Sequence, residues 1–250
     1  MSLPLHIVTR GDPALPPVVL LHGFSMSHAV FAPLMAQLSD RYHLIAPDLR
    51  GHGLSPKPED AYAVSKDWAG DIAAILAPLD HPVLLGWSMG GRVAMDYVRY
   101  HGDDALSGLA LIGSYTGPVP AATKANRGPM FDESQRDSGT AKFIRACTKE
   151  PLPEALTQTL LAEALLCPRH VRLALAARDE DYTTEARRIR KPALVLHGDA
   201  DAIVPPAASA AHNIAQATHL TYDGIGHTPF LEAPARFADD LDAFIRKARQ

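Results

Sequence analysis

The sequence predicts an α/β fold: a mostly parallel central sheet with helices on both faces and an inserted helical cap. Short apolar runs recur along the chain, and longer amphipathic segments separate most of them. This alternation is typical of parallel strands that are covered on both faces by helices. A further observation predicts the cap, because residues 114–188 contain no convincing strand. The 250 residues, 47% of them hydrophobic, suffice for one large domain with a full core.

The elements can be assigned from their local patterns, with short apolar runs as strands and longer amphipathic stretches as helices. In chain order we expect strands LHIVTR and PVVLLHG, a helix near 28–38, strand YHLIAPD, a helix over about 64–79, strand PVLLGW, a helix that follows Ser88 and runs to about 100, strand LSGLALIG, strand PALVLHGD, a helix near 206–216, strand THLTYDG and a last helix over about 234–248.

The segment 114–188 interrupts this alternation. It opens with the loop-like stretch SYTGPVPAATKANRGP. Because it lies between two predicted strands, we expect residues 1–113 and 189–250 to form one α/β core and residues 114–188 to form a cap. The cap would cover the carboxyl ends of the strands, where open α/β sheets bind ligands. The alternative is that the insert only enlarges the core. Its helical pattern EALTQTLLAEALL places four leucines on one face: Leu156, Leu160, Leu161 and Leu165.

Composition and charge argue against several classes of partner. The net charge of −4 gives no reason to expect nucleic acid or an anionic membrane, and the basic run RRIRK (187–191) is expected to end a helix, where cations suit the dipole. Cys147 and Cys167 lack a CxxC or CxxH motif, which favours free thiols in a reducing compartment. We see neither a secretory signal nor an apolar run of membrane-spanning length. We therefore expect a cytoplasmic protein with no obligate protein partner.

The stretch LLGWSMGGRV (84–93) carries the strongest chemical signal. It begins as a strand, ends as a helix and places Gly86, Trp87 and Gly90 around Ser88. A Gly-x-Ser-x-Gly pattern between strand and helix describes a nucleophile elbow, in which side chains two residues either side of the serine would collide with the neighbouring strand and helix. The turn lifts the hydroxyl above the sheet, and the new helix aims its N–H groups at the same point. We therefore expect a nucleophile here rather than a plain glycine-rich turn.

A serine nucleophile needs a base, and the base needs an acid to orient it. Of the 12 histidines, His227 is the candidate base, because it lies in DGIGHTPFLEAP, a glycine-bearing loop after the last predicted strand. The loop after PALVLHGD offers two acids. Asp199 directly follows Gly198 and suits capping the turn, whereas Asp201 has the loop length to reach His227. A metal site of His197, Asp199 and Asp201 is a weaker alternative, because the glycine of a calcium loop is absent.

The tetrahedral intermediate of acyl transfer also needs N–H donors for its oxyanion. The backbone N–H of Met89, the residue after the nucleophile, is one candidate. The second is the N–H of Phe24 in LLHGFS, a loop after an early strand in which Gly23 allows close approach. His22 in the same loop is expected to brace it rather than to take part in the chemistry.

The chain resembles the α/β-hydrolase fold superfamily over essentially its whole length. The matching stretches are VVLLHGF, LIAPDLRGHGLS, LLGWSMGG, LVLHGDADAIVP and GIGHTPFLEAP. The order Ser88, Asp201, His227 is the order of that architecture. The resemblance implies that Asp201 is the triad acid and that the loop DLRGHGLS has a structural role. Relatives that use aspartate as the nucleophile are set aside, because this chain has serine. The motif GWSMGG resembles small bacterial carboxylesterases, including the pimeloyl-ester esterase type, and is similar to enol-lactonases and cofactor-free perhydrolases.

The resemblance implies a serine hydrolase that cleaves a small to medium carboxylic ester through an acyl-enzyme, with neither metal nor cofactor. A lactonase on the same triad is one alternative, and three others stay open. Hydrolases of carbon–carbon bonds use the same triad but usually show GNSMGG, where this chain has Trp87. Acyl transfer to an acceptor other than water, including perhydrolysis, would use the same residues. A receptor-like hydrolase fold that binds a small ligand could also keep the triad, and turnover of simple esters would favour the enzyme.

Overall fold

The computed structural model describes residues 2–250, apart from the side chains of residues 126–129, and contains a seven-stranded sheet. The strand order is β1-β3-β2-β4-β5-β6-β7, in which β1 pairs antiparallel with β3 and every other neighbouring pair is parallel. The mostly parallel sheet predicted from the sequence is confirmed. The strands are β1 (Ile7–Arg10), β2 (Pro17–Leu21), β3 (His43–Pro47), β4 (Val83–Trp87), β5 (Gly108–Ile112), β6 (Ala193–Gly198) and β7 (Thr218–Tyr222).

The central strands β2, β4, β5 and β6 are buried along their whole length. This explains their uninterrupted apolar sequences, since a strand covered on both faces has no solvent side to make polar. Their parallel direction brings their carboxyl ends to one edge of the sheet. The register pairs Leu21 with Gly86 and Trp87 with Ile112, so that β2, β4 and β5 end side by side. Loops that follow these strands therefore meet at this edge.

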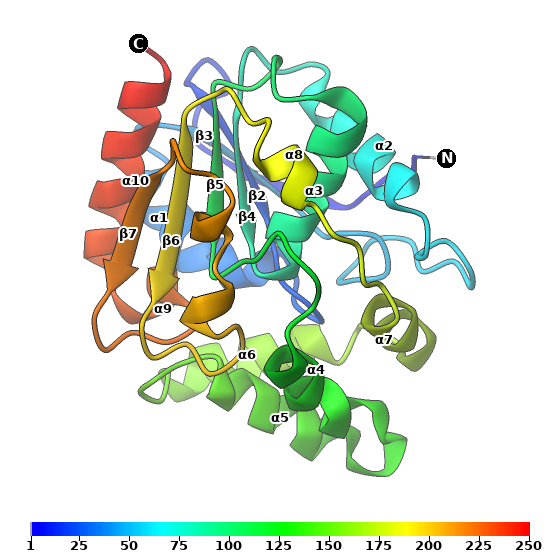
Figure 1. Cartoon of the computed structure of the whole chain (residues 1–250). Helices are drawn as coiled ribbons and strands as arrows, with labels where there is room; N and C mark the ends of the chain where they lie inside the picture. The colour runs from blue at the N-terminus through cyan, green and yellow to red at the C-terminus, as the bar shows by residue number, and fades with distance from the viewer. Residues whose placement is uncertain (1) are drawn as a thin grey trace.

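Helices cover both faces of the sheet (Figure 1). On one face α1 packs against α10, and on the other α3 packs against α2 and α8. A short 3₁₀ turn, η1 (His28–Phe31), precedes α1. The basic run predicted to end a helix begins at Arg187, the C-cap of α8. These helices are α1 (Ala32–Leu38), α2 (Ser65–Leu76), α3 (Met89–His101), α8 (Thr183–Ala186) and α10 (Pro234–Ala248).

Between β5 and β6 the described part of the chain contains helices and no strand. Figure 1 shows most of them below the sheet, across the end to which the strand arrows point. Leu160 is buried in this layer, and Leu156 and Leu161 pack against the core. The division of the chain at residues 114 and 188 stays a prediction. The elements are α4 (Ala121–Arg127), η2 (Gly128–Phe131), η3 (Glu133–Gln135), α5 (Arg136–Ala146), α6 (Glu154–Ala164) and α7 (Arg169–Ala176).

The helix expected over residues 206–216 is wrong. The structure has two 3₁₀ turns there, η4 (Pro206–Ala208) and η5 (Ala210–His212), with Ser209 in an extended conformation between them. The Ser209 hydroxyl caps η5, and the first N–H of η5 donates to the carbonyl oxygen of Ser114. A local serine bond and a tertiary bond thus replace the bonds that a continuous helix would make.

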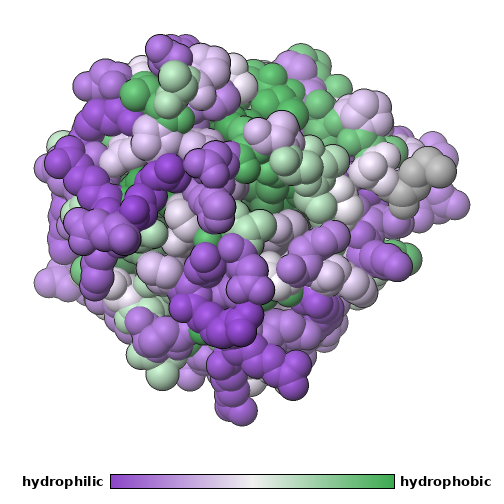
Figure 2. Space-filling model, turned by 90° about the horizontal axis from the view of Figure 1, so that it is seen from above, coloured by the Kyte–Doolittle hydropathy of each residue, from purple (hydrophilic) through white to green (hydrophobic). Residues whose placement is uncertain are grey.

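Two further features of the structure concern the hydropathy of its surface and of its helices. Figure 2 shows the face seen from above, at the amino ends of the parallel strands, where an apolar area lies beside many hydrophilic side chains. The loops that hold the candidate site lie at the opposite end of the sheet. Among residues 2–250, none of the helices is long and apolar enough to cross a bilayer.

Candidate active site

Ser88 occupies the turn between β4 and α3 with φ 55° and ψ −118°, backbone angles that residues other than glycine rarely adopt. A Cβ at Gly86 would lie 2.4 Å from the carbonyl oxygen of Gly90, and one at Gly90 would lie 2.1 Å from the carbonyl oxygen of Leu21. Both positions therefore require glycine, because α3 and β2 approach the turn too closely for any side chain. Ser88 itself is 5% exposed, and the first residue of α3 is Met89.

Asp201 and His227 are brought together by the loops after β6 and β7. The His227 Nδ1 lies 2.7 Å from Asp201 Oδ2, and both side chains are buried. The other carboxylate oxygen accepts the N–H groups of Ile203 and Val204, each at 2.8 Å. Burial acts to raise the pKa of Asp201, but the charge and hydrogen bonds of His227 and His197 outweigh it and hold that pKa well below its usual range. Asp201 is thus a fixed carboxylate beside the imidazole.

Asp199 has a different place. It is exposed, and its Oδ1 accepts the backbone N–H of Gly224 at 2.6 Å, which ties the loop after β6 to the loop after β7. The carboxylate that accepts the hydrogen bond from the His227 imidazole is that of Asp201. The positions of the two carboxylates therefore distinguish them as candidate partners of the His227 imidazole, which composition alone could not do.

Trp87 connects the elbow to the histidine loop and to the loop after β2. Its indole N–H donates to the carbonyl oxygen of His227 at 2.8 Å, and the centroids of the Trp87 and His227 rings lie 5.3 Å apart. A Cβ at Gly23 would lie 2.9 Å from the indole and 3.3 Å from the Cβ of Ser88. Only glycine at position 23 lets the loop pass this close to the serine, and Phe24 follows it directly.

The serine and the histidine are both neighbours of the end of β5. The N–H of Ser88 donates to the carbonyl oxygen of Ile112 at 2.9 Å, and a Cβ at the next residue, Gly113, would lie 3.1 Å from His227 Nδ1. The Nε2 of His227 is buried and has no hydrogen-bond partner among the described residues. The site therefore holds an oriented imidazole with one unused nitrogen near the elbow.

Two buried histidines hold the loop that carries Phe24. His22 contacts the carbonyl oxygen of Gly23 through Nδ1 and accepts the N–H of Leu49 at Nε2, both at 2.9 Å. His52 accepts the N–H of Ser25 at 3.2 Å. Burial lowers the pKa of His22 to about 4 and that of His52 to about 3, so both are neutral acceptors at neutral pH. Sequence reasoning missed the role of His52, because its partner lies 27 residues away.

The segment that follows α5 is hydrogen-bonded to the histidine loop. The carbonyl oxygen of Cys147 accepts the N–H of His227 at 2.9 Å. Glu232 lies between the two segments and accepts bonds from both of them. No local motif signalled this clamp. The Glu232 carboxylate accepts the backbone N–H groups of Lys149 at 2.7 Å, Gly226 at 3.0 Å and Thr228 at 3.2 Å, and the hydroxyl of Thr228 at 3.2 Å.

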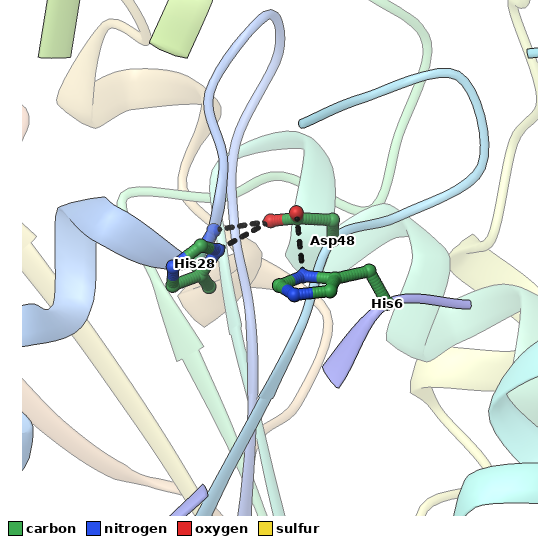
Figure 3. A group of neighbouring side chains, drawn as sticks. All are labelled: His6, His28 and Asp48. Atoms are coloured by element: carbon green, nitrogen blue, oxygen red, sulfur yellow. Dashed lines mark hydrogen bonds and ion pairs between the residues drawn. The ribbon is translucent and has the colours of Figure 1, made fainter. Parts of the chain in front are cut away.

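Within the described chain, one group of side chains has metal-ligand spacing, namely His6, His28 and Asp48 (Figure 3). Asp48 Oδ1 contacts the Nδ1 and the backbone N–H of His28, each at 2.8 Å, and Oδ2 contacts His6 Nδ1 at 3.0 Å and the N–H of Leu54 at 2.9 Å. Each carboxylate oxygen thus already accepts two donors. We interpret the group as a brace that joins η1, the end of β3 and the segment before β1.

Comparisons with known proteins show the family to which the fold belongs. A model of the alpha/beta hydrolase family matches residues 18–240. A 2-(acetamidomethylene)succinate hydrolase from Mesorhizobium japonicum is 31% identical over 78% of this chain and 74% of its own length. A pimeloyl-(acyl-carrier protein) methyl ester esterase from Aromatoleum aromaticum is 29% identical over 92% of this chain and 98% of its own. The solved structure of an esterase, RhEst1, from a Rhodococcus species has a TM-score of 0.90 at 34% identity, with 98% of this chain and 99% of that chain covered. This chain belongs to the alpha/beta hydrolase family.

Proposed function

We propose that the protein hydrolyses small to medium carboxylic esters through an acyl-enzyme on Ser88, with His227 as the base and Asp201 as the acid that orients it. One observation carries the proposal. The buried His227 binds Asp201 through Nδ1 at 2.7 Å, while its Nε2 has no partner among the described residues. An unpaired buried nitrogen costs folding free energy. That cost is explained if Nε2 receives a proton from the serine during catalysis.

The proposed mechanism assigns a role to each of these residues. The Ser88 oxygen attacks the ester carbonyl carbon and His227 Nε2 takes the hydroxyl proton, while the N–H groups of Phe24 and Met89 bind the developing oxyanion. Asp201 stabilises the imidazolium. The intermediate collapses as Nε2 gives its proton to the leaving alkoxide, which departs as the alcohol. Water then attacks the acyl-enzyme in the same way, with Nε2 as base, and releases the carboxylic acid and Ser88.

Apolar surroundings favour an apolar acyl group. Phe24, next to the elbow, has its ring 6.4 Å from that of Phe131 in η2 and 6.2 Å from that of Phe143 in α5, both edge-on. An aromatic cluster at this position would receive an alkyl or aryl chain and would reject a charged one, because burying an unpaired charge is costly. The esterase relatives support the same substrate class.

The test is a series of p-nitrophenyl esters of rising chain length, with lactones in parallel, on the wild type and on Ser88→Ala. We expect the wild type to turn over esters and Ser88→Ala to lose at least about 10³-fold in kcat. A fluorophosphonate should label the wild type and the control Ser134→Ala, an exposed serine of η3, but not Ser88→Ala. Labelling that persists in Ser88→Ala would show that the nucleophile is wrong, and turnover of lactones alone would correct the substrate.

A further inference from the structure

A second buried imidazole contacts the Asp201 carboxylate. His197, near the end of β6, is 4% exposed, and its Nε2 lies 3.1 Å from Asp201 Oδ2, the oxygen that also contacts His227 Nδ1. The same Nε2 lies 2.9 Å from the carbonyl oxygen of Val204. Asp201 is therefore held between two histidines that come from neighbouring strand ends.

The hydrogen-bond partners determine which nitrogen of His197 carries the hydrogen. A carbonyl oxygen only accepts, so Nε2 must be the donor, and its hydrogen is shared between Val204 and Asp201. In the neutral ring Nδ1 then bears a lone pair, and this atom is buried with no partner among the described residues. A leucine at this place would avoid that unpaired nitrogen. The cost of the imidazole points to a use for the N–H that it directs at Asp201.

Other titratable groups lie beside the contact between His197 and Asp201. Asp201 faces it from the loop after β6, and His227 faces the same carboxylate from the loop after β7. The thiol of Cys147 is buried, and it interacts electrostatically with the Asp201 carboxylate. Burial, together with the charge of Asp201, raises the pKa of this thiol well above its usual value, so the thiol is neutral. A carboxylate oxygen that accepts two N–H donors holds each of them less strongly than an oxygen with one donor.

We propose that His197 is a positioning residue for the acid–base pair. Its Nε2–H holds the Asp201 carboxylate toward His227 and draws part of the negative charge away from that contact. The inference rests on the proposed function, because it assigns His197 to the same ester hydrolysis.

The test compares one variant that keeps the donor with two that remove it. A glutamine amide can occupy the place of the imidazole Nε2, so His197→Gln retains the bond, whereas the amide of His197→Asn is too short to reach Asp201 and His197→Leu has no donor. We expect the Asn and Leu variants to lose about 10- to 100-fold in kcat, the range for one hydrogen bond to a charged group, with KM nearly unchanged. The acid limb of their kcat/KM profile should move to higher pH. His197→Gln should stay within about threefold of the wild type in kcat, with an unmoved profile.

His219→Leu is the control, because it removes a histidine of the adjacent strand β7 that bonds a backbone carbonyl, that of Ile214. An acid limb that stays in place in folded Asn and Leu variants would overturn the inference, as would an equal loss of kcat in His197→Gln. If Leu does not fold, the Asn and Gln pair decides. Fluorophosphonate labelling of Ser88 in the wild type separates the two claims. Without labelling the proposed function fails, whereas labelling with unchanged His197 variants defeats only this inference.

Discussion

The buried pair His22 and His52 should make the protein lose stability between pH 7 and pH 5. Their rings lie 4.9 Å apart, and both side chains are inaccessible to solvent. Burial is the main cause that lowers the pKa of His22 to about 4 and of His52 to about 3, whereas an unfolded histidine titrates near 6.5. Each ring uses Nε2 to accept a backbone N–H, which only the neutral form can do.

The sign and size of the effect follow from these pKa values. Above pH 6.5 both rings are neutral in the folded and the unfolded chain, so they add no pH dependence. Below pH 6.5 the unfolded chain takes up protons that the folded chain refuses, and stability falls by about 1.4 kcal/mol per pH unit for each ring. At pH 5 the loss is roughly 2 kcal/mol per histidine and roughly 4 kcal/mol for the pair. Total stabilities are typically about 5–15 kcal/mol, so the loss is measurable.

The assay is urea unfolding at pH 7 and pH 5 of the wild type and of His52→Gln. Glutamine can still accept the N–H of Ser25 but does not titrate, so the variant should lose only about half as much stability between the two pH values. The exposed His212→Gln is the control and should behave like the wild type. The bond to Asp48 raises the pKa of His28, which adds stability as the pH falls, but this contribution is common to all three proteins and cancels. An equal loss in His52→Gln and the wild type would refute the reasoning.

Two further predictions concern the acid and the clamp. Asp201→Asn should lower kcat by about 10⁴ because the amide can favour the wrong imidazole tautomer. Asp199→Asn should cost on the order of tenfold or less in kcat, because the Asp199 carboxylate accepts the N–H of Gly224 rather than that of the imidazole. Steady-state kinetics on one ester checks both variants, and the reverse ranking would move the acid to Asp199. Glu232→Gln should lower kcat by about tenfold and speed proteolysis of residues 114–188, because each carboxylate oxygen accepts N–H donors and the amide NH₂ must face one of them. Kinetics and limited proteolysis check this prediction, with the exposed Glu150→Gln as the control. Equal behaviour of the two variants would contradict the role of Glu232 as a clamp.

Local sequence was sufficient for the strands and the elbow. Each central strand is buried on both faces, and its uninterrupted apolar sequence indicates that burial directly. Gly86 is required by atoms of Gly90 and Gly91 in the same strand–turn–helix connection, whereas Gly90 is required by the carbonyl oxygen of Leu21 in β2. The fold class and the placement of Ser88 at a sharp turn could therefore be predicted, since both depend on patterns a few residues long.

Tertiary structure decided everything that joins distant segments. Asp199 and Asp201 share one loop, and only the packing of the β6 and β7 loops assigns the imidazole to Asp201. The bonds of His52 and Glu232 join segments far apart in the chain, and no local pattern records such a partner. The helix expected over 206–216 failed for the same reason, because a bond from the first N–H of η5 to Ser114 outweighs a local helical preference worth only tenths of a kcal/mol per residue. Sequence determines what a segment can form by itself, whereas long-range contacts determine which of its polar groups meet.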